Sequence, residues 1–405
     1  MQSKPLKRRK LDGAFWSLVG RRIVPSPEVS SGALWLQAVS VGEVEVAVTF
    51  ARAIRSSRPA LPILATASTP AGFALLKRRF ADPALSPAES RPFPLDLPMS
   101  VRRFFAAARP RILVLVETEL WPVVLLEAGR RGVPVLLVNA RLSERSARRF
   151  RALGPVVRRP LAAVRHVAAR TEADARRFVE IGVSADRVSV TGDLKYDREE
   201  LPEPDFADAF RRLAAGRPVL VAGSLANQEV PLLLDLRERL RAAGHPLFVL
   251  LAPRRPESFG AAAAELAARG IPFTRRTALD PDAPSDVFLL DSIGELGRSY
   301  RLGTLAFLGG TFAPKGGHNV LEPLAAGLPV LHGPSVSNIA ATLAACPGAT
   351  FVATDADSLA RTAGSLLSDP VLRALAAARA EALFRENRGA AARAASLAIA
   401  LLGDA

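Results

Sequence analysis

Short apolar runs alternate with amphipathic helical patterns along most of this chain. In the first half, the runs of strand length are Leu34–Val39, Ile63–Ala65, Ile112–Val116, Val133–Val138 and His166–Ala169. Helical patterns lie between them at Val44–Arg55, Met99–Ala108 and Leu120–Arg131. Strands that are apolar throughout and separated by helices are typical of a parallel sheet with both faces covered. The first half therefore predicts an α/β domain with a doubly wound sheet.

The same alternation resumes after an interruption. Residues Tyr196–Pro204 are acidic and contain two prolines, which indicates a linker. Apolar runs recur at Val219–Ala222, Leu247–Leu251, Val287–Leu290, Leu305–Leu308 and Val330–Leu331, and an Ala-rich helical pattern follows from Val371. We therefore expect Rossmann-like domains at residues 1–195 and 207–385, a linker at 196–206 and a C-terminal helix at 386–405. Two such domains would face each other across a cleft, with ligands beyond the carboxyl ends of the strands.

Composition agrees with two soluble domains in a reducing compartment. A chain of 405 residues is too long for one compact core, and a hydrophobic content of 49% with 23% charged residues is typical of globular proteins. The single cysteine, Cys346, excludes an intramolecular disulfide and suits the cytoplasm. Four histidines leave little material for a histidine metal site.

The charge balance favours anionic partners. The formal net charge is +15, but no nucleic-acid-binding module is recognisable, so nucleic acid is not an expected partner. No run of about 20 apolar residues exists, so no membrane-spanning helix is predicted. The basic segment Lys4–Lys10 precedes the apolar residues Ala14–Val19. These two segments suit an anionic membrane surface, and a basic tail without structure fits them equally.

The glycine-rich segment Gly309–Pro323 is the most distinctive motif. It follows a predicted strand and precedes a predicted helix, and Gly316 and Gly317 let the backbone approach a ligand. Asn319 and Glu322 are three residues apart, so they share one face of a helix. A carboxylate beside a glycine turn suits the hydroxyls of a ribose. The motif indicates a nucleotide-sugar site, and a plain strand–loop–helix connection capped by Asn is the alternative.

Acidic residues follow two strands of the first half. Glu43 comes just after Leu34–Val39, where a carboxylate can take a proton from a hydroxyl or can stabilise the helix dipole. Glu117 and Glu119 follow Ile112–Val116 and precede Trp121, and they suit acceptor hydroxyls or a cation. Glu43 and the pair Glu117 and Glu119 are also compatible with the simple start of a helix.

Cationic and small polar residues follow other strands. Arg141 and Lys195 are candidates for anion contacts in the first half. In the second half, Ser224 follows a strand together with a glycine, Arg254 can form a fork to phosphate, and Gly294–Glu295 begins a predicted helix.

Several enzyme classes are disfavoured. The Asp-x-Asp triplets at 280–282 and 355–357 look like a turn and a helix cap rather than metal sites. No phosphate-binding loop with Lys-Ser/Thr is present, and no Gly-x-Gly-x-x-Gly motif opens the first domain. The sequence therefore disfavours kinases and dinucleotide-dependent dehydrogenases.

Taken together, these segments resemble the Kdo transferases, which attach 3-deoxy-D-manno-octulosonic acid (Kdo) to lipid A in lipopolysaccharide biosynthesis. The segments that carry the resemblance are Ala38–Glu43, Glu117–Pro122, Val138–Arg148, Val190–Lys195, Gly294–Arg298 and Gly316–Pro323. They occur in the family's order over about residues 34–390. The chain is a divergent member, in which Gln37 and Leu225–Ala226 replace the family's usual residues and no N-terminal membrane helix is expected.

The resemblance implies a GT-B fold, with the acceptor on the first domain and the nucleotide sugar on the second. It implies an inverting glycosyltransferase that uses CMP-Kdo, a phosphorylated lipid A precursor and no metal or other cofactor, at the cytoplasmic face of the inner membrane. Glu43 would be the catalytic base. The donor-binding residues that it implies are Ser224, Arg254, Gly294, Glu295, Gly316, Gly317, Asn319, Glu322 and Lys195, and the residues of the acceptor side are Glu117, Glu119 and Arg141.

Two alternatives stay open. The changed pair Leu225–Ala226 leaves room for a GT-B transferase or epimerase with a different nucleotide sugar. A non-catalytic descendant of the family, held at a membrane by its basic N-terminal segment, is the other alternative.

Overall fold

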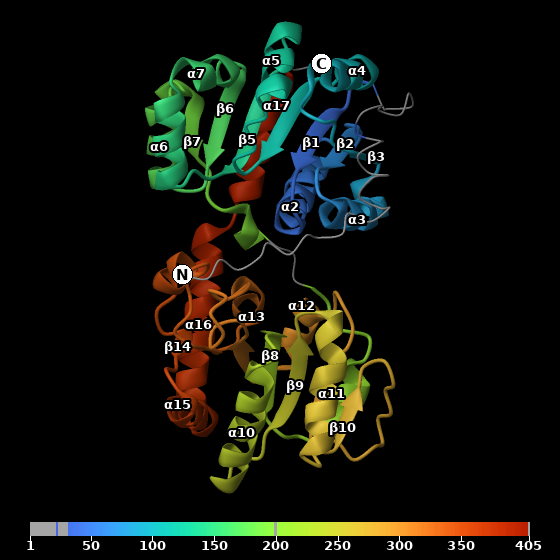
Figure 1. Ribbon diagram of the computed structural model, residues 1–405, viewed down its shortest axis with the longest axis vertical. Coiled ribbons are helices and arrows are strands. Elements are labelled where there is room, and N and C mark those ends of the chain that lie inside the picture. The colour runs from blue at the N-terminus through green and yellow to red at the C-terminus, as the bar shows by residue number, and fades with distance from the viewer. Residues whose placement is uncertain (1–21, 23–30, 198–200, 404–405) are drawn as a thin grey trace, which may run out of the picture. The chain divides into compact units, whose positions relative to one another are not determined.

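The computed structural model describes Arg22, residues 31–197 and residues 201–403 (Figure 1). The basic segment Lys4–Lys10 and the apolar segment Ala14–Val19 lie outside the described residues. The chain forms two compact units, residues 1–198 with 387–405, and residues 199–386. Within the described part of the chain, no helix has both the length and the apolar composition needed to cross a bilayer.

The first unit is built on a seven-stranded parallel sheet. Its strand order is β3-β2-β1-β4-β5-β6-β7. The strands are β1 (Leu34–Ala38), β2 (Ile63–Ala67), β3 (Ala88–Pro92), β4 (Ile112–Val116), β5 (Val135–Ala140), β6 (Val164–Ala169) and β7 (Val188–Val190). Every pairing is parallel. The order reverses between β1 and β4, and ligands of doubly wound sheets bind at such a switch point.

Helices cover both faces of this sheet. The helices of the first unit are α2 (Val41–Ser57), α3 (Pro70–Arg79), α4 (Pro98–Ala108), α5 (Pro122–Arg131), α6 (Glu144–Leu153), α7 (Pro155–Leu161), α8 (Glu172–Glu180) and α17 (Ala390–Leu402). One buried cluster joins the sheet to α2, α3 and α17, and another joins its opposite face to α4, α5, α6, α7 and α8. The sheet is therefore covered on both sides, as strands that are apolar throughout require.

The last helix belongs to the first unit. Helix α16 (Pro370–Asn387) lies in the second unit, and Gly389, with a φ of +89°, separates it from α17. Figure 1 shows α17, in red, among the elements of the first unit. Its buried face consists of alanines, at positions 390, 391, 394, 395 and 398. Small side chains let α17 pack closely against the sheet, so the first unit is completed by residues distant in sequence.

The second unit has a sheet of the same kind. Its strand order is β10-β11-β9-β8-β12-β13-β14, again with parallel pairings. The strands are β8 (Val219–Leu225), β9 (Phe248–Pro253), β10 (Phe273–Arg275), β11 (Val287–Leu289), β12 (Leu305–Leu308), β13 (Val330–His332) and β14 (Thr350–Val352). The helices are α9 (Ala207–Ala214), α10 (Glu229–Ala242), α11 (Phe259–Ala268), α12 (Leu296–Ser299), α13 (Leu321–Ala325), α14 (Ala340–Ala345), α15 (Ala356–Ser368) and α16. The order reverses between β8 and β12, which makes their ends the switch point of this unit.

The predicted α/β class is confirmed, but the sequence pattern missed four strands. These are β3, β7, β10 and β14, the outermost strands of the two sheets. Most of their residues are only half-buried, so they lack the continuous apolar run that marks an inner strand. The predicted helix after Gly309–Pro323 is also shorter than the pattern suggests, because α13 ends at Ala325, shortly before Gly327.

Gly223 leaves no room for a larger side chain in the second core. A Cβ atom at this position would lie 1.9 Å from the Tyr300 hydroxyl oxygen and 2.9 Å from its Cζ atom. We predict that Gly223→Ala lowers the free energy of unfolding by about 3 kcal/mol, because the added methyl group would overlap the buried Tyr300 ring and overpack the core. Urea denaturation measures the effect. Adding Tyr300→Phe removes the nearest atom and should recover part of the loss; if the double variant is no more stable than Gly223→Ala, steric overlap is not the cause.

Candidate active site

Glu43 lies at the switch point of the first unit, directly after β1. Its Oε2 atom accepts a hydrogen bond from the Val39 amide at 2.8 Å, and its Oε1 atom accepts one from the Ser40 hydroxyl at 2.8 Å. Both bonds tie the carboxylate to the two residues that precede α2. The side chain therefore has the structural role that the sequence also allowed. That role does not exclude proton transfer by Glu43, because both hydrogen-bond donors belong to the turn that carries Glu43.

The environment of Glu43 changes its acidity. Burial raises the pKa of the Glu43 carboxyl above its ordinary value, the charge of Glu117 raises it further, and the hydrogen bonds from Val39 and Ser40 oppose these effects. A carboxylate with a raised pKa is a better proton acceptor than an ordinary surface glutamate.

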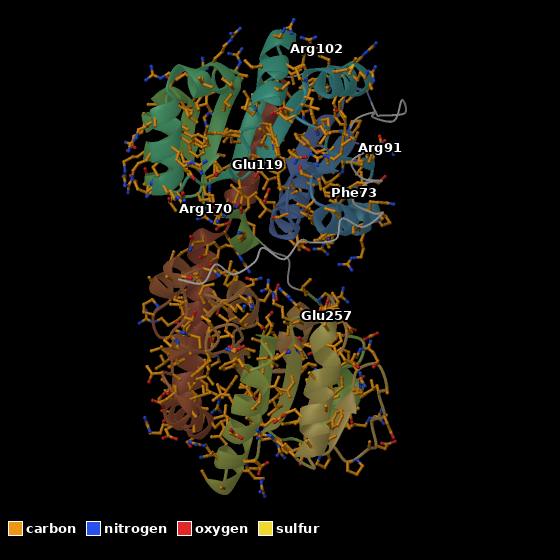
Figure 2. The ribbon with its side chains drawn as sticks, in the orientation of Figure 1. Phe73, Arg91, Arg102, Glu119, Arg170 and Glu257 are labelled. Atoms are coloured by element: carbon orange, nitrogen blue, oxygen red, sulfur yellow. The ribbon has the colours of Figure 1, made fainter. Side chains whose placement is uncertain are left out.

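Two more carboxylates follow β4, the neighbouring strand at the switch point. Glu117 has a φ of +62°, and its amide donates to the Val138 carbonyl oxygen at 2.9 Å. The carboxyl of Glu119, labelled in Figure 2, has its pKa raised to about 7, first by burial and then by the charges of Glu43 and Glu117. The structure thus couples three carboxyl groups that the sequence placed after two different strands.

Two cations belong to the same cluster. The Glu117 carboxylate is 2.9 Å from the Nε atom of Arg141 and 3.4 Å from the Nζ atom of Lys195. The sequence suggested a donor contact for Lys195, whereas the structure places its ammonium group beside Glu117. Arg141 remains largely exposed, so its guanidinium can meet an anion while it holds Glu117.

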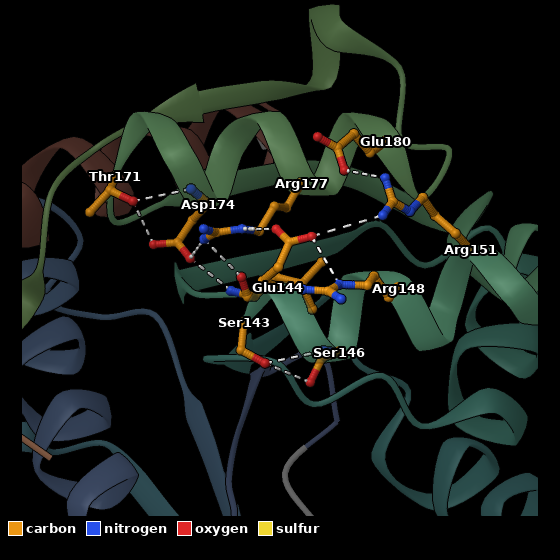
Figure 3. A network of polar contacts seen from close by, with 10 residues as sticks. Ser143, Glu144, Ser146, Arg148, Arg151, Thr171, Asp174, Arg177 and Glu180 are labelled. Atoms are coloured by element: carbon orange, nitrogen blue, oxygen red, sulfur yellow. Dashed lines mark hydrogen bonds and ion pairs between the residues drawn. The ribbon is translucent and has the colours of Figure 1, made fainter. Parts of the chain in front are cut away.

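The loop that carries Arg141 is fixed by a polar network (Figure 3). The Asp174 carboxylate accepts a hydrogen bond from the Leu142 amide at 2.8 Å, and Arg177 donates to the Leu142 carbonyl oxygen at 3.1 Å. Thr171 in turn donates to Asp174 at 2.7 Å. Because the amide and the carbonyl group of Leu142 are both hydrogen-bonded, the backbone next to Arg141 is fixed.

The raised pKa of Glu119 makes the stability of the first unit depend on pH. Its folded pKa of about 7 exceeds that of an ordinary glutamate, so the folded state binds a proton that the unfolded state loses more easily. The associated stability is present below the unfolded pKa and is lost as the pH rises through 7.

We therefore predict that Glu119→Gln stabilises the first unit at pH 8 by about 1 kcal/mol, after a discount for partial exposure, and by less at pH 5. Urea denaturation at the two pH values tests this. The control is Glu45→Gln, which removes a carboxylate paired with Arg79 on the outside of α2. If Glu119→Gln raised the free energy of unfolding equally at both pH values, the raised pKa of Glu119 would not be the cause of the gain.

At the switch point of the second unit, β8 and β12 end side by side. Ser224 has a φ of +58°, and Gly309 donates to the Gly223 carbonyl oxygen at 2.9 Å. A Cβ atom on Gly309 would lie 2.4 Å from the Ser224 carbonyl oxygen, so this approach requires glycine. The sequence predicted Ser224 at the end of one strand and Gly309 after another; the structure has Ser224 as the last residue but one of β8 and brings it close to Gly309.

Arg254 and His318 form a pair at the same edge. The Nη1 atom of Arg254 is 3.3 Å from the Nε2 atom of His318. Burial lowers the pKa of His318, the charges of Arg254 and Lys315 lower it further, and Glu229 acts in the opposite direction. The imidazole is therefore neutral at pH 7 and accepts from the exposed guanidinium of Arg254. The sequence contained His318 within its glycine motif but gave no signal for this pairing.

Glu229 is a structural residue of the site that the sequence analysis missed. It is fully buried at the start of α10, and its carboxylate accepts hydrogen bonds from five backbone amides. The donors, at 2.8 to 3.3 Å, are the amides of Ala226, Gly310, Thr311, Phe312 and Ala313. One carboxylate thus fixes the turn after β12. The sequence shows only a glutamate at the start of a helix. Its role in fixing the turn becomes visible only when the five amides surround it in the folded structure.

The remaining motif residues lie around this turn. Asn319 donates to Glu322 at 2.9 Å, as their spacing suggested, although Asn319 precedes α13. Gly316 and Gly317 have φ values of +79° and +78°. A Cβ atom on Gly297 would lie 3.8 Å from Glu322, which places the start of α12 beside this carboxylate.

Gly294 and Glu295, which the sequence predicted to bind the donor, come directly before α12. The Glu295 carboxylate is 2.9 Å from the Nη2 atom of Arg276 and also accepts from the Ser292 hydroxyl, so it is already paired. Gly294 is exposed, with a φ of +95°. The two Asp-x-Asp triplets act as turn and cap, because Asp280 accepts from the Asp282 amide and Asp355 caps α15. Among the described residues, no group of three His, Cys, Asp or Glu side chains is arranged to hold a metal ion.

The comparisons with known proteins agree with this arrangement. The family model described as 3-deoxy-D-manno-octulosonic-acid transferase (kdotransferase) matches residues 17–198. The 3-deoxy-D-manno-octulosonic acid transferase of Bordetella pertussis is 35% identical over 399 residues, which cover 95% of this chain and 92% of the relative. That of Haemophilus influenzae is 33% identical over 394 residues, which cover 95% of this chain and 90% of the relative.

Solved structures support the fold alone. A glycosyltransferase from Rickettsia africae superposes with a TM-score of 0.59 at 10% identity, covering 93% of this chain and all of the other. A structure described as a UDP-N-acetylglucosamine 2-epimerase from Listeria monocytogenes gives a TM-score of 0.58 at 14% identity, covering 86% and 91%. Both neighbours have the GT-B architecture, so the predicted fold is confirmed.

Proposed function

This chain belongs to the family of 3-deoxy-D-manno-octulosonic acid transferases and is a glycosyltransferase, and we propose that it moves Kdo from CMP-Kdo to a phosphorylated lipid A precursor with inversion at the sugar. The observation that carries the proposal is the buried Glu43, with its raised pKa, at the switch point of the first sheet. There it is coupled to two further carboxylates.

The proposed reaction is a single displacement. The acceptor hydroxyl gives its proton to the Glu43 carboxylate while its oxygen forms a bond to the anomeric carbon of Kdo. The bond from that carbon to the phosphate oxygen of CMP breaks, and CMP leaves with the electron pair. Attack from the face opposite the leaving group inverts the configuration. Glu43 is needed because an alcohol has too high a pKa to lose its proton unaided at neutral pH.

The second unit is proposed to bind the donor. The leaving phosphate gains negative charge, which the exposed guanidinium of Arg254 and the turn around Ser224 are suited to stabilise. Glu322, oriented by Asn319, has a carboxylate suited to the ribose hydroxyls. We propose that no metal takes part, because Arg254 supplies the positive charge that a metal would otherwise supply.

The first unit is proposed to bind the acceptor. Arg141 and Lys195 place two cations beside Glu117, and a lipid A precursor carries phosphates that such cations attract. A lipid acceptor requires access to a membrane surface. We therefore propose that the protein works peripherally at the cytoplasmic face of the inner membrane, where its net charge of +15 favours anionic lipid.

A donor-and-acceptor assay tests the proposal. The full chain is incubated with CMP-Kdo and a lipid A precursor, and mass spectrometry follows the lipid while CMP release is measured. We expect a lipid heavier by Kdo residues, released CMP, and a rate unchanged by EDTA. Turnover of a UDP-sugar but not of CMP-Kdo would overturn the donor assignment. A folded protein without transfer of any sugar would favour a binding protein instead.

A further inference from the structure

A groove of about 650 Å³ runs over the outside of the first unit. It lies on the layer formed by α4, α5 and α7, in which α4 and α7 both pack against α5. Its lining includes Val123 and Leu126 of α5 and continues over Ala162 and Ala163, the two residues after α7. None of the residues proposed above for sugar transfer lines it.

Small residues create this groove. A Cβ atom on Gly129 would lie 3.3 Å from the Ala163 Cβ atom, so α5 and the segment after α7 approach closely there. Ala162 and Ala163 add little side-chain volume above this contact. The floor of the groove is therefore apolar, and its small side chains leave room for a chain of methylene groups.

The rim of the groove is cationic. Arg102 of α4, labelled in Figure 2, Arg130 of α5 and Arg159 of α7 all line it. Glu127 is the one carboxylate among the described residues of the lining, and Arg131 already binds its Oε1 atom at 2.7 Å. The guanidinium nitrogens of Arg130 and Arg102 stay at 3.6 and 3.9 Å from its Oε2 atom.

These contacts leave positive charge available. Arg102 and Arg130 are 58% and 67% exposed, and Arg159 has no ion-pair partner within the described part of the chain. Three arginines against one buried, already paired carboxylate leave an excess of positive charge above an apolar floor. That combination matches an anion attached to an apolar chain.

Exposed apolar side chains flank the groove. Leu97 and Met99, on either side of the lining residue Pro98, are 56% and 62% exposed. Val156, three residues before Arg159 on α7, is 73% exposed. Single exposed apolar residues are ordinary, but several beside one groove mark an interaction surface. Apolar and cationic side chains next to one another are typical of proteins that rest on anionic membranes.

We propose that this groove binds an anionic phospholipid of the bilayer. The headgroup phosphate would contact Arg102, Arg130 and Arg159, and the upper part of an acyl chain would lie over Leu126 and Ala163. Nucleic acid fits less well, because the lining residues within the described part of the chain include no aromatic side chain that could stack on a base. The site needs neither CMP-Kdo nor acceptor, so it stands apart from sugar transfer.

Vesicle co-sedimentation of the full chain tests the charge. The vesicles contain phosphatidylcholine with or without phosphatidylglycerol, at 0.15 M salt, and no donor is added. We expect binding to the anionic vesicles that falls about a hundredfold for the triple variant R102Q/R130Q/R159Q. The matched control is R212Q/R361Q/R379Q, which removes the same charge from exposed positions of the second unit. Equal losses in the two variants would mean non-specific attraction and would overturn the proposal.

A second measurement tests the acyl chain. Ala162→Trp places a fluorophore in the groove, and its added emission should be quenched by phosphatidylglycerol with brominated acyl chains. Vesicle binding without such quenching would overturn insertion into the groove. Binding only to neutral vesicles that contain the lipid A precursor would assign the groove to the acceptor instead. Transfer to a detergent-dispersed acceptor should survive the triple variant, which separates failure of this site from failure of the proposed function.

Discussion

Replacing Glu43 with glutamine is expected to lower the rate of sugar transfer about a thousandfold. Glutamine keeps the size of the side chain, and its carbonyl oxygen can still accept one of the two bonds from Val39 and Ser40. It cannot take the proton of the acceptor hydroxyl. The measurement is kcat/KM for the lipid acceptor, from CMP release confirmed by the mass of the product.

The control for this change is Glu45→Gln, on the same helix two residues away. Glu45 pairs with Arg79 at 2.7 Å and has no part in the proposed chemistry, so its loss should leave transfer within about twofold. Circular dichroism establishes that both variants are folded. If Glu43→Gln retains more than a tenth of the parent rate, Glu43 is only a cap for α2 and another group is the base.

The pH dependence adds an independent test of the same residue. A base must be ionised to act, so kcat/KM falls as the pH drops through the pKa of Glu43. Because burial raises that pKa, the fall should occur at a higher pH than for an ordinary glutamate. The acidic limb should disappear in the residual activity of Glu43→Gln.

Replacing Arg254 with alanine is expected to lower kcat/KM for CMP-Kdo about a hundredfold. Its guanidinium lies against the neutral imidazole of His318 and has further donors free for a phosphate. Loss of a preorganised donor to a leaving group affects the transition state more than the bound substrate. The expected change is therefore mainly in kcat.

The neighbouring residue provides the matched control. Arg255 is also exposed and carries the same charge, but its side chain makes no hydrogen bond or ion pair with another described residue. Arg255→Ala should change kcat/KM by less than about threefold, as expected for loss of a screened surface charge. Equal effects of the two substitutions would indicate long-range attraction of the donor rather than a contact with its phosphate.

The sequence predicted the inner parts of both sheets because buried parallel strands are apolar throughout. Outer strands such as β3 were not predicted, because a half-buried strand at the edge of a sheet does not need a continuous apolar run. The position of α17 was also not predictable. A row of alanines indicates a helix but does not say which unit it covers, and only the packed structure joins it to α2.

The candidate site was predictable as residue types at strand ends, because parallel strands bring their carboxyl ends to one edge. The pairing of those residues was not. Nothing in the sequence says that Lys195 meets Glu117, or that Glu229 holds the turn after β12. Such contacts depend on side-chain directions, which the spacing of residues along the chain does not encode.

The return of α17 to the first unit has a consequence for synthesis on the ribosome. When residues up to 386 have been synthesised, the second unit has all of its segments, whereas the first still lacks the helix that covers part of its sheet. Nascent chains would then display an incomplete apolar surface until translation reaches residue 402. Chaperone binding should persist to that late stage, and a stop codon at position 388 should send the product to aggregation or proteolysis.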